Sequence, residues 1–355
     1  MNRMRPKTRT ASGGTARRRV SRRAALALVV GSFVLIGAGA AKADLREVVE
    51  TLSADDLEGR GLGTEGLNRA LVYLEEQFEE AGLAPLGDDG YRQVFTGPGG
   101  ETLANLVGVF GDPEAGRHVV LGAHYDHLGR GEPGDANHGL IHPGADDNAS
   151  GVAALLDCAW RLREEGAAAH PVVLVAFSGE ETGLLGSAHY TAHPALPLNE
   201  CTAMINLDTV GRLENGALMI FGADTADELP KILRGVNYGF GFELDLPEND
   251  PGGSDQLSFV RRGVSAVQIF TGPHADYHRP GDTLYKIDFY GLARIAGFTT
   301  EQVFYLADRD DPLAFIPPGA KAAAGSGPPT GAPATSRKVS FGSIPDFNHQ
   351  GTGVL

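Results

Sequence analysis

The chain has 355 residues, of which 42% are hydrophobic and 21% charged, and its formal net charge is −15. These values exclude a membrane bundle, a disulfide-stapled miniprotein and a fully disordered chain, and they leave a globular protein of one large domain or two. The acidic average also argues against a nucleic-acid-binding protein.

The charge is unevenly distributed because residues 1–43 form a basic leader. This leader holds ten Lys or Arg and no acidic residue, so the rest of the chain carries 20 basic and 45 acidic residues, a formal charge of −25. The leader has the order of a secretory signal peptide. Basic residues come first, the apolar run AALALVVGSFVLIGAGAA follows, and the small residues Ala41 and Ala43 precede Asp44. We therefore expect cleavage and export. Ser21-Arg22-Arg23 partly resembles a twin-arginine signal, and an uncleaved membrane anchor is the alternative.

Apolar spacing predicts the elements of the body in chain order. Apolar positions recur at helical spacing over 67–83 and 149–165, which predicts two helices. Cys158 falls in the second helix, where a free buried thiol is expected, and Cys201 receives no role. Apolar runs predict strands at 119–123, 171–177, 203–208, 217–221 and 264–270. Such strands alternating with helices indicate an α/β sheet that is covered on both faces.

The composition changes after residue 310. Residues 311–337 are rich in Pro, Gly and Ala, which is typical of a linker. Residues 338–355 read as two short strands around a turn, too little to fold alone. We therefore expect a signal peptide (1–43), a catalytic body (44–310), the linker, and the truncated start of a second module (338–355).

Acidic and imidazole side chains follow the predicted strands. They are His124, Asp126, Asp146, Asp147, Glu180, Glu181, Asp208 and His278. Because the carboxyl ends of parallel strands meet at one edge of a sheet, we expect these side chains to lie together. Singly, each element has a structural explanation, such as a helix cap for Asp-Asp, but their joint occurrence in this order favours a site. Imidazoles and carboxylates without thiolate fit a borderline divalent metal, above all zinc.

The number of candidate ligands fits two zinc ions that share a bridging carboxylate. We expect His124 and Asp208 on one ion. Glu181 and His278 would bind the other, with Asp146 between them. Asp126, two residues after His124, would accept a hydrogen bond from the second nitrogen of that imidazole.

Glu180 and Glu181 are expected to have different tasks, because consecutive side chains do not share a direction. While Glu181 binds metal, Glu180 would face a water whose pKa the cations lower to about 7. A free carboxylate there can take the proton of that water and deliver it to a leaving amine. Glu180 is therefore the predicted general base. Other histidines are expected to have no such role. His127, His138 and His142 either line the cleft or, as we favour, lie in the solvent, and His274 shapes its loop.

Five stretches of the sequence resemble the M28 family of co-catalytic zinc aminopeptidases. They are GAHYDHLG, PGADDNASGVAALL, FSGEETGLLGS, NLDTVGR and FTGPHADYHRPGDTLYKI, and the resemblance extends over roughly residues 44–310. It implies an α/β three-layer sandwich with a mixed, largely parallel central sheet and helices on both faces. It also implies metal ligation by His124, Asp146, Glu181, Asp208 and His278, with Glu180 as general base.

This chain differs from the family pattern at one position, and its tail resembles a second kind of domain. Many relatives read Ser-Asp-His where this chain has Ser254-Asp255-Gln256, so the contacts of that histidine are not carried over. The tail from Lys338 resembles the opening of a PDZ domain, as some relatives carry after such a linker. A complete domain of this kind would bind a peptide or protein partner by strand addition.

The sequence therefore predicts an exported exopeptidase that removes amino-terminal residues from peptides. One alternative is an M20-like carboxypeptidase or amidohydrolase. Only 69 residues separate Asp208 from His278, however, whereas those enzymes usually insert a whole lid or dimerisation domain there. Further alternatives are a glutaminyl-cyclase-like transferase with a single zinc ion, and a degenerate peptidase fold that acts as a binding module.

Overall fold

The computed structural model describes residues 44–320, except 132, 135, 167, 214, 215 and 251. The predicted signal peptide, the PDZ-like tail and most of the predicted linker lie outside the described residues. In the described part of the chain, no helix is both long enough and apolar enough to cross a membrane.

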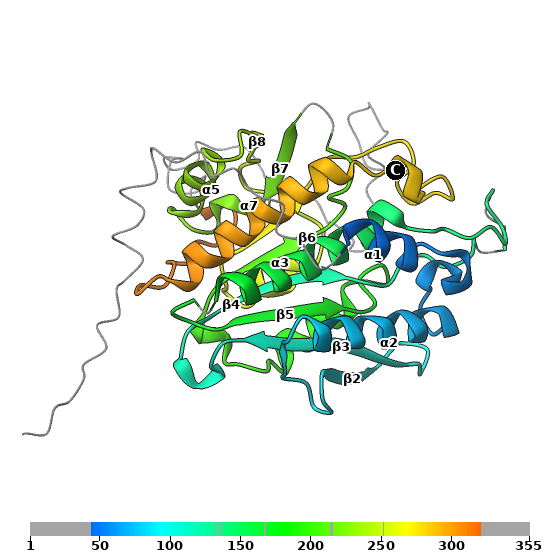
Figure 1. Cartoon of the computed structure of the whole chain (residues 1–355), viewed down its shortest axis with the longest axis horizontal. Helices are drawn as coiled ribbons and strands as arrows, with labels where there is room; N and C mark the ends of the chain where they lie inside the picture. Colours follow the sequence, from blue (N-terminus) through cyan, green and yellow to red (C-terminus); the bar gives the residue numbers. More distant parts are fainter. Residues whose placement is uncertain are drawn as a thin grey trace, which may run out of the picture. The chain divides into compact units, whose positions relative to one another are not determined.

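The described strands form one mixed, nine-stranded sheet (Figure 1). Its central strands β5, β4, β6 and β9 are parallel neighbours, and antiparallel pairs flank them on both sides. The strands are β1 (Ala84–Pro85), β2 (Arg92–Thr96), β3 (Thr102–Phe110), β4 (His118–His124), β5 (Val172–Phe177), β6 (Cys201–Leu207), β7 (Ala217–Phe221), β8 (Glu243–Asp245) and β9 (Ala266–Phe270). The order is β1-β3-β5-β4-β6-β9-β7-β8, with β2 also paired to β3.

The register of the parallel strands brings their carboxyl ends level. His124, the last residue of β4, pairs with Phe177, the last residue of β5. On the other side of β4, Gly122 pairs with Asn206 of β6, and Leu207 pairs with Ile269 of β9. Residues that follow these strands therefore emerge at one edge of the sheet.

Helices cover both faces of the sheet, which explains why every residue of β4 and β5 is buried. The larger core lies under α1 (Leu45–Leu52), α2 (Glu65–Glu80), α3 (Gly151–Glu165), α5 (Leu229–Asn237) and α7 (Phe289–Ala307), and the smaller one lies under α4 (Leu185–Ala192) and α6 (Gln256–Val260). Figure 1 shows α3 and α7 side by side across the sheet. Short helical turns complete the fold: η2 (Asp55–Arg60), η3 (Pro113–Ala115), η4 (Ala145–Ser150), η5 (Leu198–Glu200), η6 (Ala223–Thr225) and η7 (Leu284–Lys286).

The predicted α/β class, the mixed sheet and its two helical layers are confirmed. Both predicted helices and all five predicted strands are present, with ends that differ by a few residues. Strand β3 was not predicted, and it contains the polar residue Asn105. In the structure this amide is buried, and its nitrogen donates to the Gln93 side chain at 3.0 Å and to the Gly186 carbonyl at 2.9 Å. Cys158 is a buried free thiol, as expected, and Cys201 is also free.

Candidate metal centre

Three parallel strands and one loop bring the predicted site residues together. His124 ends β4, Glu180 and Glu181 follow β5, and Asp208 directly follows β6. His278 lies in the loop after β9 and adopts a left-handed backbone conformation with φ 55°, which is strained for a residue with a side chain. These residues therefore lie at or directly after the carboxyl ends of the central strands, as the sequence analysis expected.

The structure places Asp147, and not Asp146, between the two groups of ligand candidates. Asp147 Oδ1 lies 3.5 Å from His124 Nε2, and Asp147 Oδ2 lies 3.0 Å from His278 Nε2. The two oxygens of this one carboxylate therefore face two separate imidazoles. This is the position that the sequence analysis gave to Asp146.

Asp146 instead holds the loop that carries Asp147. Its Oδ1 accepts hydrogen bonds from the Gly211 backbone at 2.6 Å and from the Ser150 hydroxyl at 3.0 Å. Its Oδ2 lies 3.1 Å from His274 Nε2, so His274 contacts this anchor. The backbone at Asp147 within η4 is non-helical, and it turns the two neighbouring carboxylates toward different partners.

Two clusters with the chemistry of metal ligands share Asp147. In the first cluster, His124 Nε2 lies 3.5 Å from Asp208 Oδ1 as well as from Asp147. In the second, His278 Nε2 lies 3.3 Å from Glu181 Oε2. Zinc bonds to N and O ligands of about 2.0–2.1 Å in a tetrahedron separate the ligand atoms by about 3.3 Å. The observed spacings match that separation.

Two polar atoms of the second cluster lack hydrogen-bond partners, which is consistent with a bound cation. Asp147 Oδ2 and His278 Nε2 are buried, and neither has a hydrogen-bond partner in the described structure although they lie 3.0 Å apart. Buried polar atoms are almost always paired, so an unpaired acceptor and an imidazole nitrogen side by side point to a shared positive partner. The residues present therefore fit the metal that their chemistry implies.

His127 is a neighbour of this centre that sequence reasoning missed. It was expected in the solvent, but it is 2% exposed, and its Nδ1 lies 2.7 Å from Glu181 Oε1. His142 is also buried, contrary to expectation, whereas His138 is exposed as expected. The one available signal was position, because His127 lies three residues after His124 at the same strand end.

Burial and the charges of neighbouring side chains shift the pKa values of Asp147, Glu181 and His278. Burial raises the pKa of Asp147, and the nearby Glu181 charge adds to this effect. Burial also favours the neutral form of Glu181, but the hydrogen bond from His127 and the close contact with His278 outweigh it and hold the pKa of Glu181 well below its usual range. For His278, burial is outweighed by its contacts with Asp147 and Glu181, which raise its pKa to about 11. His278 is thus protonated beside Asp147 and Glu181 at neutral pH.

Glu180 differs from Glu181 in its surroundings. Burial raises the pKa of Glu180 well above its usual range, and the charges of Glu181, Asp208 and Asp255 act in the same direction against that of His124. A carboxyl group with a raised pKa can both accept and release a proton near neutrality. The two adjacent glutamates therefore have the different properties that the sequence analysis expected.

Two buried carboxylates hold the backbone of the centre. Asp126 accepts hydrogen bonds from the backbone N–H groups of Glu180 at 3.1 Å and Glu181 at 3.3 Å, and its Oδ1 lies 3.7 Å from His124 Nδ1. Asp282 accepts hydrogen bonds from the backbone N–H groups of Asp146 at 2.9 Å and Asp147 at 3.0 Å. His124 Nδ1 lies closer to the Asp126 backbone carbonyl, at 3.3 Å, so the predicted hydrogen bond to the Asp126 carboxylate is replaced by one to its backbone. The carboxylate itself links the ends of β4 and β5.

Gln256 belongs to a chain of amides that ends at Asp208. The Gln256 side chain donates to Gln268 at 3.0 Å, and Gln268 donates to Asp208 Oδ2 at 3.2 Å. Two glutamines in series therefore support a carboxylate of the candidate site.

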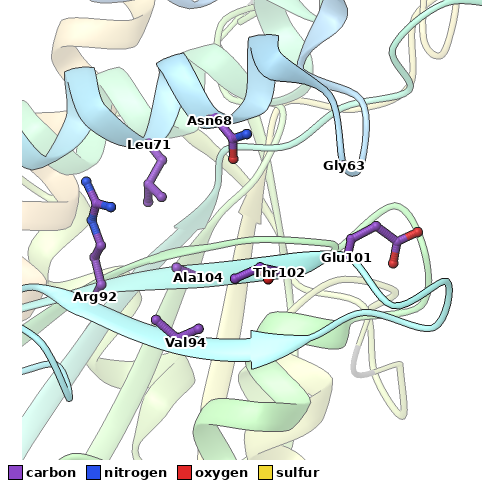
Figure 2. A pocket seen from close by; sticks show the side chains of 8 residues that line it. All are labelled: Gly63, Asn68, Leu71, Arg92, Val94, Glu101, Thr102 and Ala104. Carbon is purple, nitrogen blue, oxygen red and sulfur yellow. The ribbon is translucent and has the colours of Figure 1, made fainter.

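A separate pocket of about 340 Å³ lies between α2 and the strands β2 and β3 (Figure 2). Figure 2 shows Asn68 and Leu71 on the helix facing Thr102 and Ala104 on the sheet. The lining residues are Gly63, Asn68, Leu71, Arg92, Val94, Glu101, Thr102 and Ala104, and they include no residue of the two clusters. The candidate metal centre is therefore a different place from this pocket.

Comparison with known proteins gives both a family and relatives. The model of peptidase family M28 matches residues 105–301, more than half of the chain. Protein YfbL of Escherichia coli is 28% identical over 71% of this chain and 82% of its own length. Aminopeptidase YwaD of Bacillus subtilis is 28% identical over 58% of this chain. The match covers only 45% of the length of that relative.

Solved structures share the fold. A Zn-dependent exopeptidase from Parabacteroides distasonis matches with a TM-score of 0.62 and 21% identity, over 76% of this chain and 98% of the other. Porphyromonas gingivalis glutaminyl cyclase matches with a TM-score of 0.63 and 20% identity, over 74% and 97%. At these identities the likeness shows the architecture alone.

Proposed function

The chain belongs to peptidase family M28, and from this premise we propose that it is an exported metal-dependent aminopeptidase that hydrolyses the amino-terminal peptide bond of peptides. The observation that carries the proposal is Asp147, whose two carboxylate oxygens face two separate clusters of ligand candidates. The similarity to aminopeptidase YwaD supports the activity. The basic leader followed by an apolar run supports export.

Two zinc ions are the cofactors that the clusters fit. We assign the first ion to His124, Asp147 and Asp208, and the second to Asp147, Glu181 and His278. When bound, such ions polarise a substrate carbonyl and lower the pKa of water to about 7. Three protein atoms for each ion leave a position open to substrate, as in catalytic zinc sites.

Glu180 is the proposed general base. Its carboxylate would take a proton from the attacking water and deliver the proton to the amine that leaves. The raised pKa of Glu180 supports this task, because the group must release the proton that it has accepted. Asp126 would act through its neighbours, by holding the Glu180 backbone with its carboxylate and the His124 ring with its backbone carbonyl.

A substrate panel tests the reaction itself. The panel pairs free and N-acetylated aminoacyl and peptidyl substrates, each with and without a chelator. An aminopeptidase cleaves only the free substrates, and chelation abolishes the cleavage. Equal cleavage of acetylated substrates, or cleavage that persists in the chelator, would contradict the proposal.

Glu180→Gln tests the assigned base. The substitution keeps the size and hydrogen-bonding capacity of the side chain but removes its proton-accepting carboxylate. We expect zinc content to stay at the wild-type level while kcat falls by a factor of about 10²–10⁴, the usual contribution of a general base. Zinc content by elemental analysis and kcat on the same preparation provide the check. Wild-type turnover in a zinc-loaded variant would remove Glu180 from this role.

A glutaminyl-cyclase-like transferase is the second candidate, because solved structures with that title share this fold. Its signature would be about one zinc ion per chain and cyclisation of amino-terminal glutamine without hydrolysis. The two complete clusters around Asp147 favour the aminopeptidase.

A further inference from the structure

His127 is a buried imidazole that the proposed reaction leaves unused. It follows β4 in the loop whose backbone is tied to η2, where the His127 N–H donates to the Arg60 carbonyl at 3.1 Å. Its side chain is fully buried, with Nδ1 2.7 Å from Glu181 Oε1. A rigid backbone and a buried ring therefore aim this nitrogen at a carboxylate of the second cluster.

The two oxygens of Glu181 have different partners. Oε1 lies 2.7 Å from His127 Nδ1, and Oε2 lies 3.3 Å from His278 Nε2. Asp147 Oδ2 lies 3.0 Å from the same His278 nitrogen. Oε1 of Glu181 thus faces His127, and Oε2 faces the nitrogen that Asp147 also contacts. Because His127, Asp147 and Glu181 also lie close enough together to hold an ion, the distances must decide between a ligand and a hydrogen-bond donor.

The distances distinguish a hydrogen bond from a shared ion. Ligand atoms around one zinc ion lie about 3.3 Å apart, given bonds of about 2.0–2.1 Å. The His127–Glu181 contact of 2.7 Å is shorter than this and matches a hydrogen bond to a charged acceptor, typically about 2.7–2.9 Å. His127 Nδ1 is also 3.8 Å from Asp147 Oδ2, beyond the spacing of the other pairs.

The same contact fixes where the imidazole proton lies. A lone pair on Nδ1 facing a carboxylate oxygen at 2.7 Å would be repulsive, so Nδ1 carries the proton and donates it. The other ring nitrogen, Nε2, has no hydrogen-bond partner among the described residues. His127 therefore acts on Glu181 as a donor.

We propose that His127 is a positioning residue of the second metal site. Its Nδ1–H holds Glu181 Oε1, so that Glu181 presents only Oε2 beside Asp147 Oδ2 and His278 Nε2. This assignment rests on the proposed two-zinc centre and deepens it. It makes the two sites unequal, because the hydrogen bond from His127 supports a ligand of the second ion alone.

Zinc titration of the metal-free protein against a competing chelator tests the assignment. Outer partners of metal ligands typically contribute about 10- to 100-fold in affinity. We expect H127A to weaken one of the two sites by that factor and to leave the other at the wild-type value. H127N is expected to restore the weaker site to near the wild-type affinity, because an Asn amide nitrogen lies close to the place of Nδ1.

Control variants separate this effect from a loss of packing. H118A removes a buried imidazole at the opposite end of β4, so it should leave both zinc affinities unchanged. H127Q keeps the volume filled but puts its amide nearer the place of Nε2, and it is expected to bind as weakly as H127A. The comparison of H127N with H127Q therefore tests the proposal even where the alanine variant does not fold.

Two results would overturn the proposal. One is wild-type zinc affinity at both sites in H127A and H127Q. The other is an H127N variant that folds but binds as weakly as H127Q, because that would make His127 a ligand and not a donor. A wild-type chain that binds fewer than two zinc ions would instead refute the two-zinc centre, and this assignment with it.

Discussion

Asp146 and Asp147 are neighbours in the chain but have different partners. Asp147 faces the imidazoles of His124 and His278, whereas Asp146 accepts hydrogen bonds from Gly211 and Ser150. A bridging carboxylate must offer one oxygen to each ion, and Asp147 has that arrangement. The two residues should therefore respond differently to the same substitution.

Asp147→Asn is expected to lower zinc binding below two ions per chain and kcat/KM by more than about 100-fold, since losing a ligand should exceed the 10- to 100-fold effect of an outer partner. Asp146→Asn keeps an acceptor oxygen, so it should retain both zinc ions. It should lower the free energy of unfolding by about 1–3 kcal/mol, because charged hydrogen bonds of a buried group are lost. Zinc content and urea unfolding of both variants provide the check, and equal zinc loss in both would contradict the distinction.

Sequence reasoning worked at this scale where chemistry alone identifies a residue. A histidine at a strand end followed by an aspartate two residues later was enough to place His124 and Asp126. The choice within Asp146-Asp147 depends on the local backbone of η4, which one sequence does not specify. His127 was missed for a related reason, because its carboxylate partner comes from a distant segment of the chain.

At the scale of elements, the start of α3 fixes the distance between η4 and the end of β6. Asn148 Oδ1 accepts hydrogen bonds from the backbone N–H groups of Gly151 at 3.0 Å and Thr209 at 3.1 Å. A Cβ on Gly151 would lie 2.2 Å from that same oxygen and 2.5 Å from the Leu207 carbonyl. Close approach therefore requires glycine at the first residue of this helix.

Gly151→Ala is expected to destabilise the protein by about 1–3 kcal/mol, the usual cost of overpacking a buried contact. It should also weaken zinc binding, because it forces Asp147 away from Asp208. Gly235→Ala in α5 is the matched control: nothing lies within 4 Å of its Cβ position, so it should stabilise by about 0.5–1 kcal/mol. Urea unfolding measures the change in stability of both variants, and zinc titration measures their metal affinity. An unperturbed Gly151 variant would show that α3 can shift without cost.

The elements that sequence predicted best are those with continuous apolar runs, such as β4 and β5, because burial on both faces leaves that signature. Short elements such as α6 were missed because five residues carry too little periodicity. The site was nevertheless predictable, since its residues follow the well-predicted strands.

At the scale of the whole molecule, the candidate metal centre and the buried histidine His118 lie at opposite ends of the central sheet. The ligand candidates gather at the carboxyl ends of the strands, and His118 begins β4 at the opposite end, paired with Cys201 of β6. His118 is fully buried, and neither ring nitrogen has a hydrogen-bond partner among the described residues. Burial lowers the pKa of His118 to about 4.

This lowered pKa makes His118 a source of acid destabilisation. An unfolded histidine has a pKa of about 6.5, so between pH 6.5 and 4 the unfolded chain binds more protons at this residue than the folded chain. Stability therefore falls as the pH drops through this window, by about 2 kcal/mol between pH 7 and pH 5 for this group. Above pH 6.5 the residue is neutral in both states and has no such effect.

His118→Leu should remove that contribution while leaving the metal centre intact. The measurement is urea unfolding of metal-free wild type and variant at pH 7 and pH 5, because metal-free protein excludes loss of zinc at the lower pH. The wild type should lose about 2 kcal/mol more than the variant over this interval. Equal losses would mean that His118 is protonated in the folded protein, so that acid sensitivity arises from the carboxylate and imidazole cluster at the other end of the sheet.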